Sequence, residues 1–265
     1  MSHYELSLHP GTANWIPWLD LSRIARSSGY AAFVVSRDAE PTNTPPALPA
    51  SSMLLTAEVR RDQATFEQTF PRLRPLAEFA AKLGAKSASC AIPSSAPIPK
   101  DQYADLLRAR LKPCCDVLAE FGMRLAVECL TPLHIRRAHP YEFIWHNAEM
   151  LDFARSIAPN TGLIVDAWHW HHGGSHPSEI LDLPADAIAD VHITDSPDLP
   201  PEQIHDYKRA LPGTGVVDFP TFFDLLRQTD YARPITVEGF IPDLERLSPE
   251  DAAALAFQHS RAVVP

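Results

Sequence analysis

Leu163-Ile164-Val165-Asp166 is a short apolar run that ends on a residue able to bind a metal ion. A run of this kind, bounded by turn signals, is typical of a buried parallel strand. The same pattern recurs in three other segments, which are Leu125-Ala126-Val127-Glu128, Ala189-Asp190-Val191-His192 and Ile235-Thr236-Val237-Glu238. In a β/α barrel the carboxyl ends of such strands form the face that carries the active site. The four segments therefore predict Glu, Asp and His side chains gathered at one end of a barrel.

Strand-like and helix-like segments alternate along the whole chain. Amphipathic stretches separate the strands, and the longest of them is expected over residues 101–121. The expected strands are Tyr4–Leu8, Ala31–Val35, Ser52–Ala57, Ser87–Ile92, Arg124–Cys129, Gly162–Ala167, Ile188–Thr194 and Pro234–Gly239. Eight such units, with no glycine-rich phosphate-binding loop after the first strand, favour a closed barrel over an open doubly wound sheet. The prediction is an α/β protein, a single-domain (β/α)8 TIM barrel over residues 1–265.

Charge and hydropathy argue against two classes of partner. The formal net charge of −10 repels the phosphate backbone of nucleic acids. No apolar stretch approaches the ~18 residues that a membrane span needs. The first residues, Met1-Ser2-His3-Tyr4-Glu5, lack the basic and apolar regions of a secretory signal. We therefore expect a cytoplasmic protein that binds neither nucleic acid nor membrane.

The acids and the histidine at the strand ends predict a metal site. Taken singly, an Asp or Glu after a strand is more often a helix cap or a solvated charge. Four ligand-type residues at four strand ends are harder to dismiss, and crowded carboxylates repel one another unless a cation lies between them. The mixed oxygen and nitrogen donors favour Mn²⁺, with Mg²⁺, Co²⁺ and Zn²⁺ as alternatives. The predicted ligands of this one divalent ion are Glu128, Asp166, His192 and Glu238.

Several loop residues near these strand ends are candidates for substrate contacts. The segment Trp168-His169-Trp170-His171-His172 is expected to form a loop whose aromatic rings and imidazoles suit a polyol, with a His-rich surface loop as the alternative. Asp195 follows the strand of His192 and has three interpretations, which are a hydrogen bond to that histidine, a substrate contact and a local turn. Arg209 precedes a Pro-Gly turn, and its guanidinium group could bind a substrate oxygen. Considered alone, this residue is better interpreted as a solvated surface arginine.

Taken in order, these motifs resemble the sugar phosphate isomerase/epimerase family, whose members have a xylose-isomerase-like TIM barrel. The resemblance covers about the C-terminal half of the chain and is carried by Val127-Glu128, Val165-Asp166-Ala167-Trp168-His169, Val191-His192-Ile193-Thr194-Asp195, the turn from Arg209 to Gly215, and Thr236-Val237-Glu238. It implies that the four predicted ligands bind the metal and that Glu128 and Glu238 also act as the catalytic acid/base pair. It further implies that His169 and Arg209 contact substrate oxygens. Barrels of this family commonly pair, so the resemblance extends to a homodimer.

Other candidates lie outside these motifs. His134 is in the loop that follows Glu128 and is near enough in sequence to reach the site. In the N-terminal half the candidates for substrate contact are His9 and Glu58.

The predicted reaction is proton transfer next to a carbonyl group, through an enediolate, on a small sugar or polyol. A cation stabilises the negative charge that appears on oxygen, one glutamate removes the proton and the other returns it. The first alternative is a metal-dependent dehydratase or lyase on a keto-sugar or keto-inositol, because its first step is identical. An endonuclease-type phosphodiesterase and a catalytically silent sugar-binding protein are the remaining alternatives.

Overall fold

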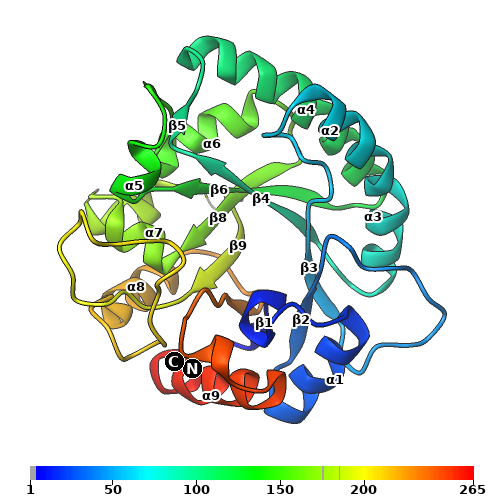
Figure 1. Cartoon of the computed structure of the whole chain (residues 1–265), viewed down its shortest axis with the longest axis vertical. Coiled ribbons are helices and arrows are strands. Elements are labelled where there is room, and N and C mark those ends of the chain that lie inside the picture. The colour runs from blue at the N-terminus through cyan, green and yellow to red at the C-terminus, as the bar shows by residue number, and fades with distance from the viewer. Residues whose placement is uncertain (1–3, 175, 185) are drawn as a thin grey trace.

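Parallel strands form a closed ring at the centre of the molecule (Figure 1). The structure is a computed structural model and describes residues 4–174, 176–184 and 186–265. Within these residues the ring has the strand order β1-β10-β9-β8-β6-β4-β3-β2. Its strands are β1 (Leu6–Leu8), β2 (Ala32–Val35), β3 (Ala50–Leu54), β4 (Ser87–Pro93), β6 (Arg124–Leu130), β8 (Thr161–Asp166), β9 (Ile188–Ile193) and β10 (Ile235–Val237). The predicted single-domain (β/α)8 barrel is confirmed.

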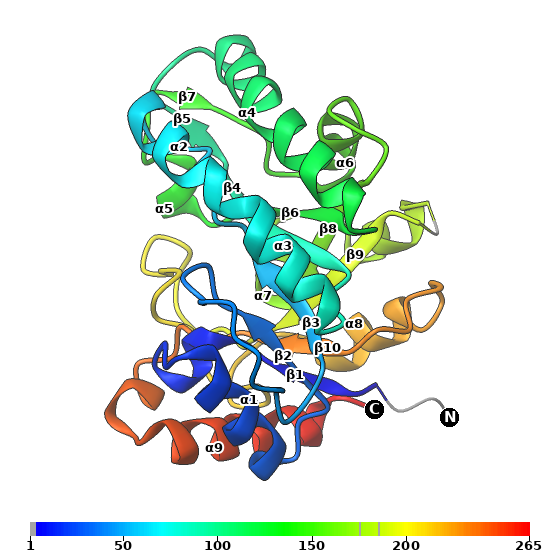
Figure 2. The same ribbon diagram turned by 90° about the vertical axis from the view of Figure 1, so that its right-hand side faces the viewer.

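Helices cover the outside of the ring, as Figures 1 and 2 show. Their apolar faces pack against the strands, and the buried side chains of the barrel and the helices form one continuous core. The helices are α1 (Trp18–Ser28), α2 (Gln63–Thr69), α3 (Leu73–Lys82), α4 (Lys100–Glu120), α5 (Leu133–Arg136), α6 (Asn147–Arg155), α7 (Ala167–His172), α8 (Phe219–Leu226) and α9 (Pro249–Val263), with 3-10 turns η1 (Pro10–Ala13), η2 (Phe70–Arg72), η3 (Pro177–Asp182) and η4 (Leu244–Arg246). None of the helices in the described residues is long and apolar enough to cross a membrane.

The strands differ from the sequence prediction in their exact bounds and in one additional pair. Strand β3 begins two residues earlier than expected, because the polar side chains of Ser51 and Ser52 are buried in the barrel. The Ser51 hydroxyl is satisfied there by the hydroxyl of Ser7, 2.6 Å away on β1. In addition, β5 (Ser95–Ala96) and β7 (Tyr141–Glu142) form a small antiparallel pair that the sequence pattern did not predict.

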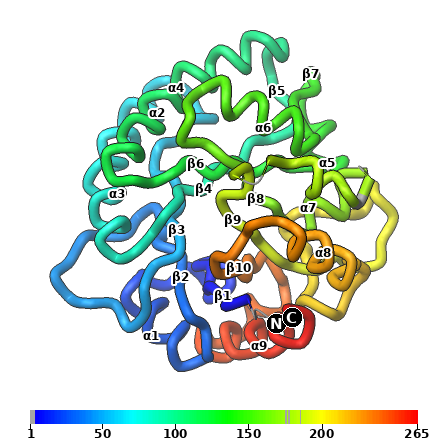
Figure 3. Tube along the Cα trace, turned by 180° about the vertical axis from the view of Figure 1, so that it is seen from behind, coloured from blue at the N-terminus to red at the C-terminus, as the bar shows by residue number. Residues whose placement is uncertain are grey.

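The two ends of the barrel are built differently. At one end the segments that follow the strands project outward, including α5 and the loop between β9 and α8 (Figure 2). Seen from behind, α1 and α9 again lie side by side, as they do in Figure 1 (Figure 3). At the opposite, N-terminal end, Arg233 lies just before β10 and donates to the carbonyl of Ser51 on β3, at 2.8 Å, and to that of Ala189 on β9. One arginine therefore ties together strands from opposite sides of the ring.

Candidate active site at the carboxyl ends of the strands

A cavity of about 400 Å³ opens at the carboxyl ends of the strands. Its wall includes residues at or just after the ends of β1, β2, β3, β6, β9 and β10, so the whole ring contributes. This volume falls within the range of cavities that bind small molecules. The position agrees with the general rule for this fold, in which the active site lies at the carboxyl face.

The four predicted metal ligands meet at one side of this cavity. Each offers a ligand atom, and these atoms all lie within 4.8 Å of one another. Glu238 directly follows β10, His192 is on β9, Asp166 ends β8 and Glu128 is on β6. Since these four strands are consecutive in the ring, the two glutamates flank the aspartate and the histidine. Strand pairing places Asp166 opposite His192, and both glutamates and His192 line the cavity.

The donor atoms of this cluster fit a divalent cation. All four side chains are buried, and neither Glu128 Oε1 nor His192 Nδ1 has a hydrogen-bond partner within the described structure. These two atoms lie 3.8 Å apart, and His192 Nδ1 is 3.7 Å from Glu238 Oε2. Buried polar atoms without partners are costly, and a cation between them would remove that cost. Three carboxylates and an imidazole are also a usual donor set for such an ion.

Burial and mutual charge displace the pKa values of the cluster from their ordinary values. Burial, together with the charges of Glu238 and Asp166, raises the pKa of Glu128 well above its usual range. Burial would also raise the pKa of Glu238, but His192 and Arg209 hold that pKa well below its usual range. Burial lowers the pKa of His192, whereas the surrounding carboxylates, foremost Glu238, raise it to about 10. Displacements of this kind are characteristic of functional sites.

Arg209 lies directly against this cluster rather than on the surface. Its Nη1 atom is 3.0 Å from Asp166 Oδ2 and 3.2 Å from Glu238 Oε2. Its Nη2 atom donates to Asp206 Oδ1 at 2.7 Å. The guanidinium group also packs over the ring of Trp168, with 4.5 Å between Cζ and the ring centroid. Although Arg209 is buried, its charge is therefore fully compensated by carboxylates and an aromatic face.

Trp168 and His169 lie on α7, a short helix where the sequence predicted a loop. Asp166 begins this helix, because its Oδ1 atom accepts hydrogen bonds from the backbone N–H groups of Trp168 and His169 at 2.6 and 3.1 Å. His169 Nε2 lies 3.4 Å from Arg209 Nη2, and its Nδ1 faces the backbone N–H of Thr131. Neither Trp168 nor His169 is among the residues that line the cavity. The structure thus places both residues behind Arg209, where they support it.

Asp195 and His134 are engaged elsewhere in the structure. Asp195 is buried, and its two oxygens accept hydrogen bonds from the backbone N–H groups of four residues, Ser196, Gly213, Gly215 and Val217. It therefore holds the turn that follows Arg209, and it does not line the cavity. His134 stacks on His205, with ring centroids 4.4 Å apart, and accepts a hydrogen bond from the backbone N–H of Asp206. It contacts the loop before Arg209 and is not part of the cavity wall.

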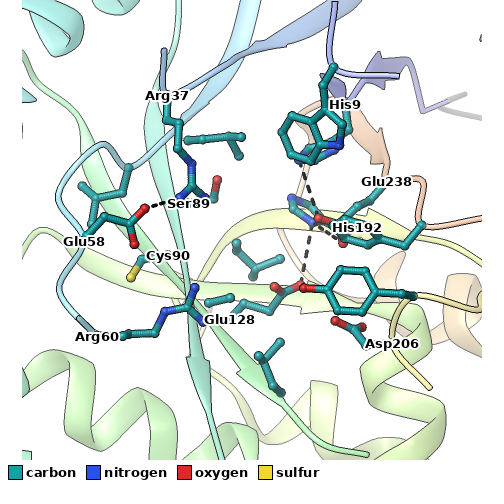
Figure 4. Close-up of a pocket in the computed structure, with 18 of the residues that line it drawn as sticks. His9, Arg37, Glu58, Arg60, Ser89, Cys90, Glu128, His192, Asp206 and Glu238 are labelled. Atoms are coloured by element: carbon teal, nitrogen blue, oxygen red, sulfur yellow. Dashed lines mark hydrogen bonds and ion pairs between the residues drawn. The ribbon is translucent and has the colours of Figure 1, made fainter. Parts of the chain in front are cut away.

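Figure 4 shows the cavity with His192 and Glu238 on one side and Arg37, Glu58 and Arg60 from the N-terminal half on the other. His9 and Glu58, the two candidates from that half, both line the cavity, and His9 Nε2 lies 3.6 Å from Glu238 Oε1. The sequence pattern did not predict Arg37, Arg60 or Asp206 as cavity residues. Arg37 follows β2 closely and Arg60 follows β3 by a few residues, so their positions after strands were the available signal.

Comparison with known proteins places this site in a family context. The model of the family described as xylose isomerase-like TIM barrel matches residues 48–263. The inosose isomerase of Halalkalibacterium halodurans is 24% identical over 205 residues, which are 74% of this chain and 68% of that protein. The ketose 3-epimerase of Arthrobacter globiformis is 37% identical over 95 residues, 34% of this chain and 29% of that protein. The 3-dehydroshikimate dehydratase of Pseudomonas putida is 29% identical over 121 residues, 45% of this chain and 18% of that protein.

Solved structures of similar chains have the same architecture. A xylose isomerase domain protein from Alicyclobacillus acidocaldarius superposes with a TM-score of 0.86 at 27% identity, covering 98% of this chain and 97% of that chain. The IolI protein with a bound zinc atom superposes with a TM-score of 0.79 at 18% identity, covering 98% of both chains. The second similarity is one of fold alone.

Proposed function

Because the chain belongs to the xylose isomerase-like TIM barrel family, we propose that it is a divalent-metal-dependent isomerase or epimerase of a small sugar or polyol. The observation that carries this proposal is the convergence of Glu128, Asp166, His192 and Glu238, of which the two glutamates and His192 line one cavity. The similarity to an inosose isomerase and to a ketose epimerase supports the reaction class. It also supports a role as an enzyme rather than as a silent sugar-binding protein.

The cluster supports the proposed cofactor, and Mn²⁺ is the cation we propose. A divalent ion held by these four side chains would act as a Lewis acid that stabilises negative charge on the oxygen of a carbonyl substrate. Oxygen and nitrogen donors together suit Mn²⁺, and Mg²⁺, Co²⁺ and Zn²⁺ stay as alternatives. Zinc is the metal present in the IolI structure.

In the proposed reaction the two cavity-lining glutamates transfer the proton. One of Glu128 and Glu238 removes a proton from the carbon next to the carbonyl group, which produces an enediolate. The other returns a proton to the opposite face of that carbon, giving an epimer, or to the neighbouring carbon, giving an isomer. Their positions on the outer two of four consecutive strands allow them to approach a bound molecule from two sides. Arg209 is in contact with both Asp166 and Glu238 and compensates part of their negative charge.

Dehydration is the alternative that a specific observation favours. The chain is also similar to 3-dehydroshikimate dehydratases, at 29% identity to those of two Pseudomonas species. After the same proton removal, a hydroxyl group on the next carbon would leave with its bonding electrons and accept a proton from the second glutamate. A carbon–carbon double bond and one water molecule would result.

Deuterium exchange distinguishes these reactions. Metal-loaded protein is incubated in D2O with an inosose and with ketoses, and the products are followed by proton NMR. An isomerase or epimerase gives deuterium at the carbon next to the carbonyl group with the carbon skeleton and all hydroxyl groups retained. A dehydratase gives an unsaturated product instead. A chelator should abolish either reaction, and added Mn²⁺ should restore it.

Variants at the two glutamates test the assignment of the proton transfer. Glu128→Gln and Glu238→Gln should each lower turnover by at least about a hundredfold, since each removes a group that carries the proton. Glu245→Gln is the control, because Glu245 lines the same cavity but is not in the cluster. Full turnover in both cluster variants would refute the mechanism.

Release of phosphate or nicking of nucleic acid would instead support the endonuclease alternative.

A further inference from the structure

We propose that the substrate carries an anionic group, a carboxylate or a phosphate, which binds to Arg60 and Arg37 on the cavity wall opposite the metal ligands. This inference rests on the proposed function in one respect, because it takes this cavity as the place where the carbonyl substrate binds. It specifies the chemical class of that substrate. The substrate is a polyhydroxy ketone whose negative charge lies far from its carbonyl group.

The topology of the barrel places the two arginines across the cavity from the cluster. The ligands follow or end β10, β9, β8 and β6, which are consecutive in the ring. Arg37 follows β2 and Arg60 follows β3, and in the same ring order β2 lies opposite β8 and β3 lies opposite β9. All of these strands open into one cavity of about 400 Å³. A small molecule in it therefore contacts the cluster with one end and this arginine wall with the other.

The close-up view shows how the side chains of this wall are directed. In Figure 4, Arg37 and Arg60 reach in from above and below on one side, with Cys90 between them, and His192 and Glu238 lie on the other side. Cys90 is on β4, next to the strand of Glu128, and it lines the same cavity as both arginines. Two guanidinium groups that converge on one space can hold the oxygens of a single carboxylate or phosphate by paired hydrogen bonds.

The charge of this wall is only partly compensated within the protein. Arg37 Nη1 lies 2.6 Å from Glu58 Oε1, in a pair whose side chains are 46% and 24% exposed. Between residues 4 and 265, leaving aside positions 175 and 185, no carboxylate forms an ion pair with Arg60. Arg37, Glu58 and Arg60 together thus have a net positive charge, whereas the chain as a whole has a formal net charge of −10. A ligand anion would supply the missing partner and would be attracted by the local field.

Other charged residues of the cavity do not offer such a place. Arg209 is already bound to Asp206, Asp166 and Glu238, so it has no free charge for a second anion. Glu245 also lines the cavity, where it lies with Trp15 and Phe240 in an adjoining hollow, and it would repel an anion. The anionic end of the substrate is therefore directed to Arg60.

Binding measurements with three related hexuloses test this inference. The metal-loaded protein is titrated by calorimetry with D-fructose, with its 6-carboxylate D-fructuronate and with D-fructose 6-phosphate. At least one of the two anions should bind about tenfold more tightly than fructose, as expected for charge-assisted hydrogen bonds. The comparison of the two anions shows whether the wall prefers a carboxylate or a phosphate.

The variant Arg60→Gln should remove most of this preference and leave the affinity for fructose unchanged. Arg61→Gln is the matched control, because it removes the same charge from the adjacent residue, which does not line the cavity. Equal affinity for all three hexuloses, no binding of either anion at millimolar concentration, or equal effects of the two variants would overturn the inference. Thermal unfolding of both variants verifies that they fold.

The proposed function is judged separately, by deuterium exchange. If deuterium exchanges into a neutral ketose and the protein binds anions no more tightly, the proposed function stands and the proposed anionic substrate is rejected. If anions bind in a way that depends on Arg60 but no substrate exchanges a proton, the anion site is supported and the proposed isomerase or epimerase function is contradicted.

Discussion

Asp190 lies beneath His192 on the same strand and is in a position to orient its imidazole ring. It is buried, its Oδ2 atom has no hydrogen-bond partner within the described structure, and this atom faces His192 Nε2 at 4.0 Å. The other ring nitrogen, Nδ1, faces Glu128 and Glu238. A carboxylate behind a metal-binding histidine fixes the tautomer and the ring orientation. We infer that Asp190 positions His192 without contacting the metal or the substrate.

The variant Asp190→Asn should therefore lower the affinity for a divalent metal about tenfold to a hundredfold, the usual effect of removing such a partner. Competition with a coloured chelator for Zn²⁺ or Co²⁺ measures this affinity. Asp105→Asn, an exposed position on α4, is the control. If both variants bind metal as tightly as the wild type, Asp190 does not position the ligand.

His172 gives the fold a dependence on pH. Burial, assisted by neighbouring charges such as His171, lowers the pKa of His172 to about 3, and its Nε2 atom lies 2.9 Å from the Ser196 hydroxyl. The folded protein keeps this ring neutral, whereas the unfolded chain protonates it near pH 6.5. The stability that His172 contributes is therefore complete above about pH 6.5 and is lost as the pH falls toward about 3.

Urea denaturation at pH 7 and pH 5 tests this dependence. Between these values the wild type should lose about 1 to 2 kcal/mol more unfolding free energy than His172→Asn. His139→Asn, at an exposed position, should retain the slope of the wild type. An identical loss in the wild type and in His172→Asn would show that another group is responsible.

At the scale of elements, the eight barrel strands were predictable, whereas the antiparallel pair of β5 and β7, the start of β3 and helix α7 were not. All eight predicted strands overlap observed ones, because each contains an apolar run. The start of β3 at Ala50 was missed since the buried polar side chain of Ser51 is satisfied by a partner distant in sequence, Ser7. Helix α7 was missed for a different reason. Asp166 was interpreted as a ligand alone, whereas its second oxygen also caps the helix.

Asp195 organises the turn that positions Arg209. The backbone of Asp195 pairs with that of Ala210, and its carboxylate accepts four backbone N–H groups around this turn. The close packing also excludes a side chain at Gly215, where an added Cβ would lie 2.0 Å from the Ser196 carbonyl oxygen. The turn is therefore fixed by one buried carboxylate.

Asp195→Ala should lower the free energy of unfolding by about 3 kcal/mol, because it leaves several buried N–H groups without acceptors. It should also weaken metal binding, since Arg209 would lose its fixed place beside Asp166 and Glu238. Asp195→Asn, which keeps one acceptor oxygen, should have a smaller effect on both quantities. Urea denaturation and the chelator competition provide the two measurements. Unchanged stability in Asp195→Ala would contradict the assigned role.

At the scale of the whole molecule, the barrel explains why the cluster of Glu128, Asp166, His192 and Glu238 could be predicted and its surroundings could not. Parallel strands bring their carboxyl ends to one rim, so four strand-end residues converge whatever the loops do. The contacts of Arg209 and the direction of Arg60 depend instead on the path of loops between elements. Sequence periodicity carries no information about these paths, so it could not show that Asp195 holds the turn after Arg209 or that His134 stacks on His205.

The barrel also separates stability from chemistry, because its two ends are built from different residues. Arg233 closes the N-terminal end, where it bonds to the Ser51 and Ala189 carbonyls and to the Ser87 hydroxyl on β4 at 3.2 Å. The metal cluster lies at the other end, and Arg233 is not part of the cavity wall. In this fold the N-terminal end usually serves stability.

Arg233→Met retains the aliphatic part of the side chain but removes the hydrogen bonds that Arg233 donates to these acceptors. It should therefore lower the free energy of unfolding by about 2 to 4 kcal/mol. The folded fraction should still bind metal with an affinity within about twofold of the wild type, because additivity holds for distant sites. Arg227→Met is the control, since its ion pair with Asp224 lies on the surface. If Arg233→Met is fully folded but has lost much of its metal affinity, strain at one end of the barrel reaches the other. The two ends would then not be independent.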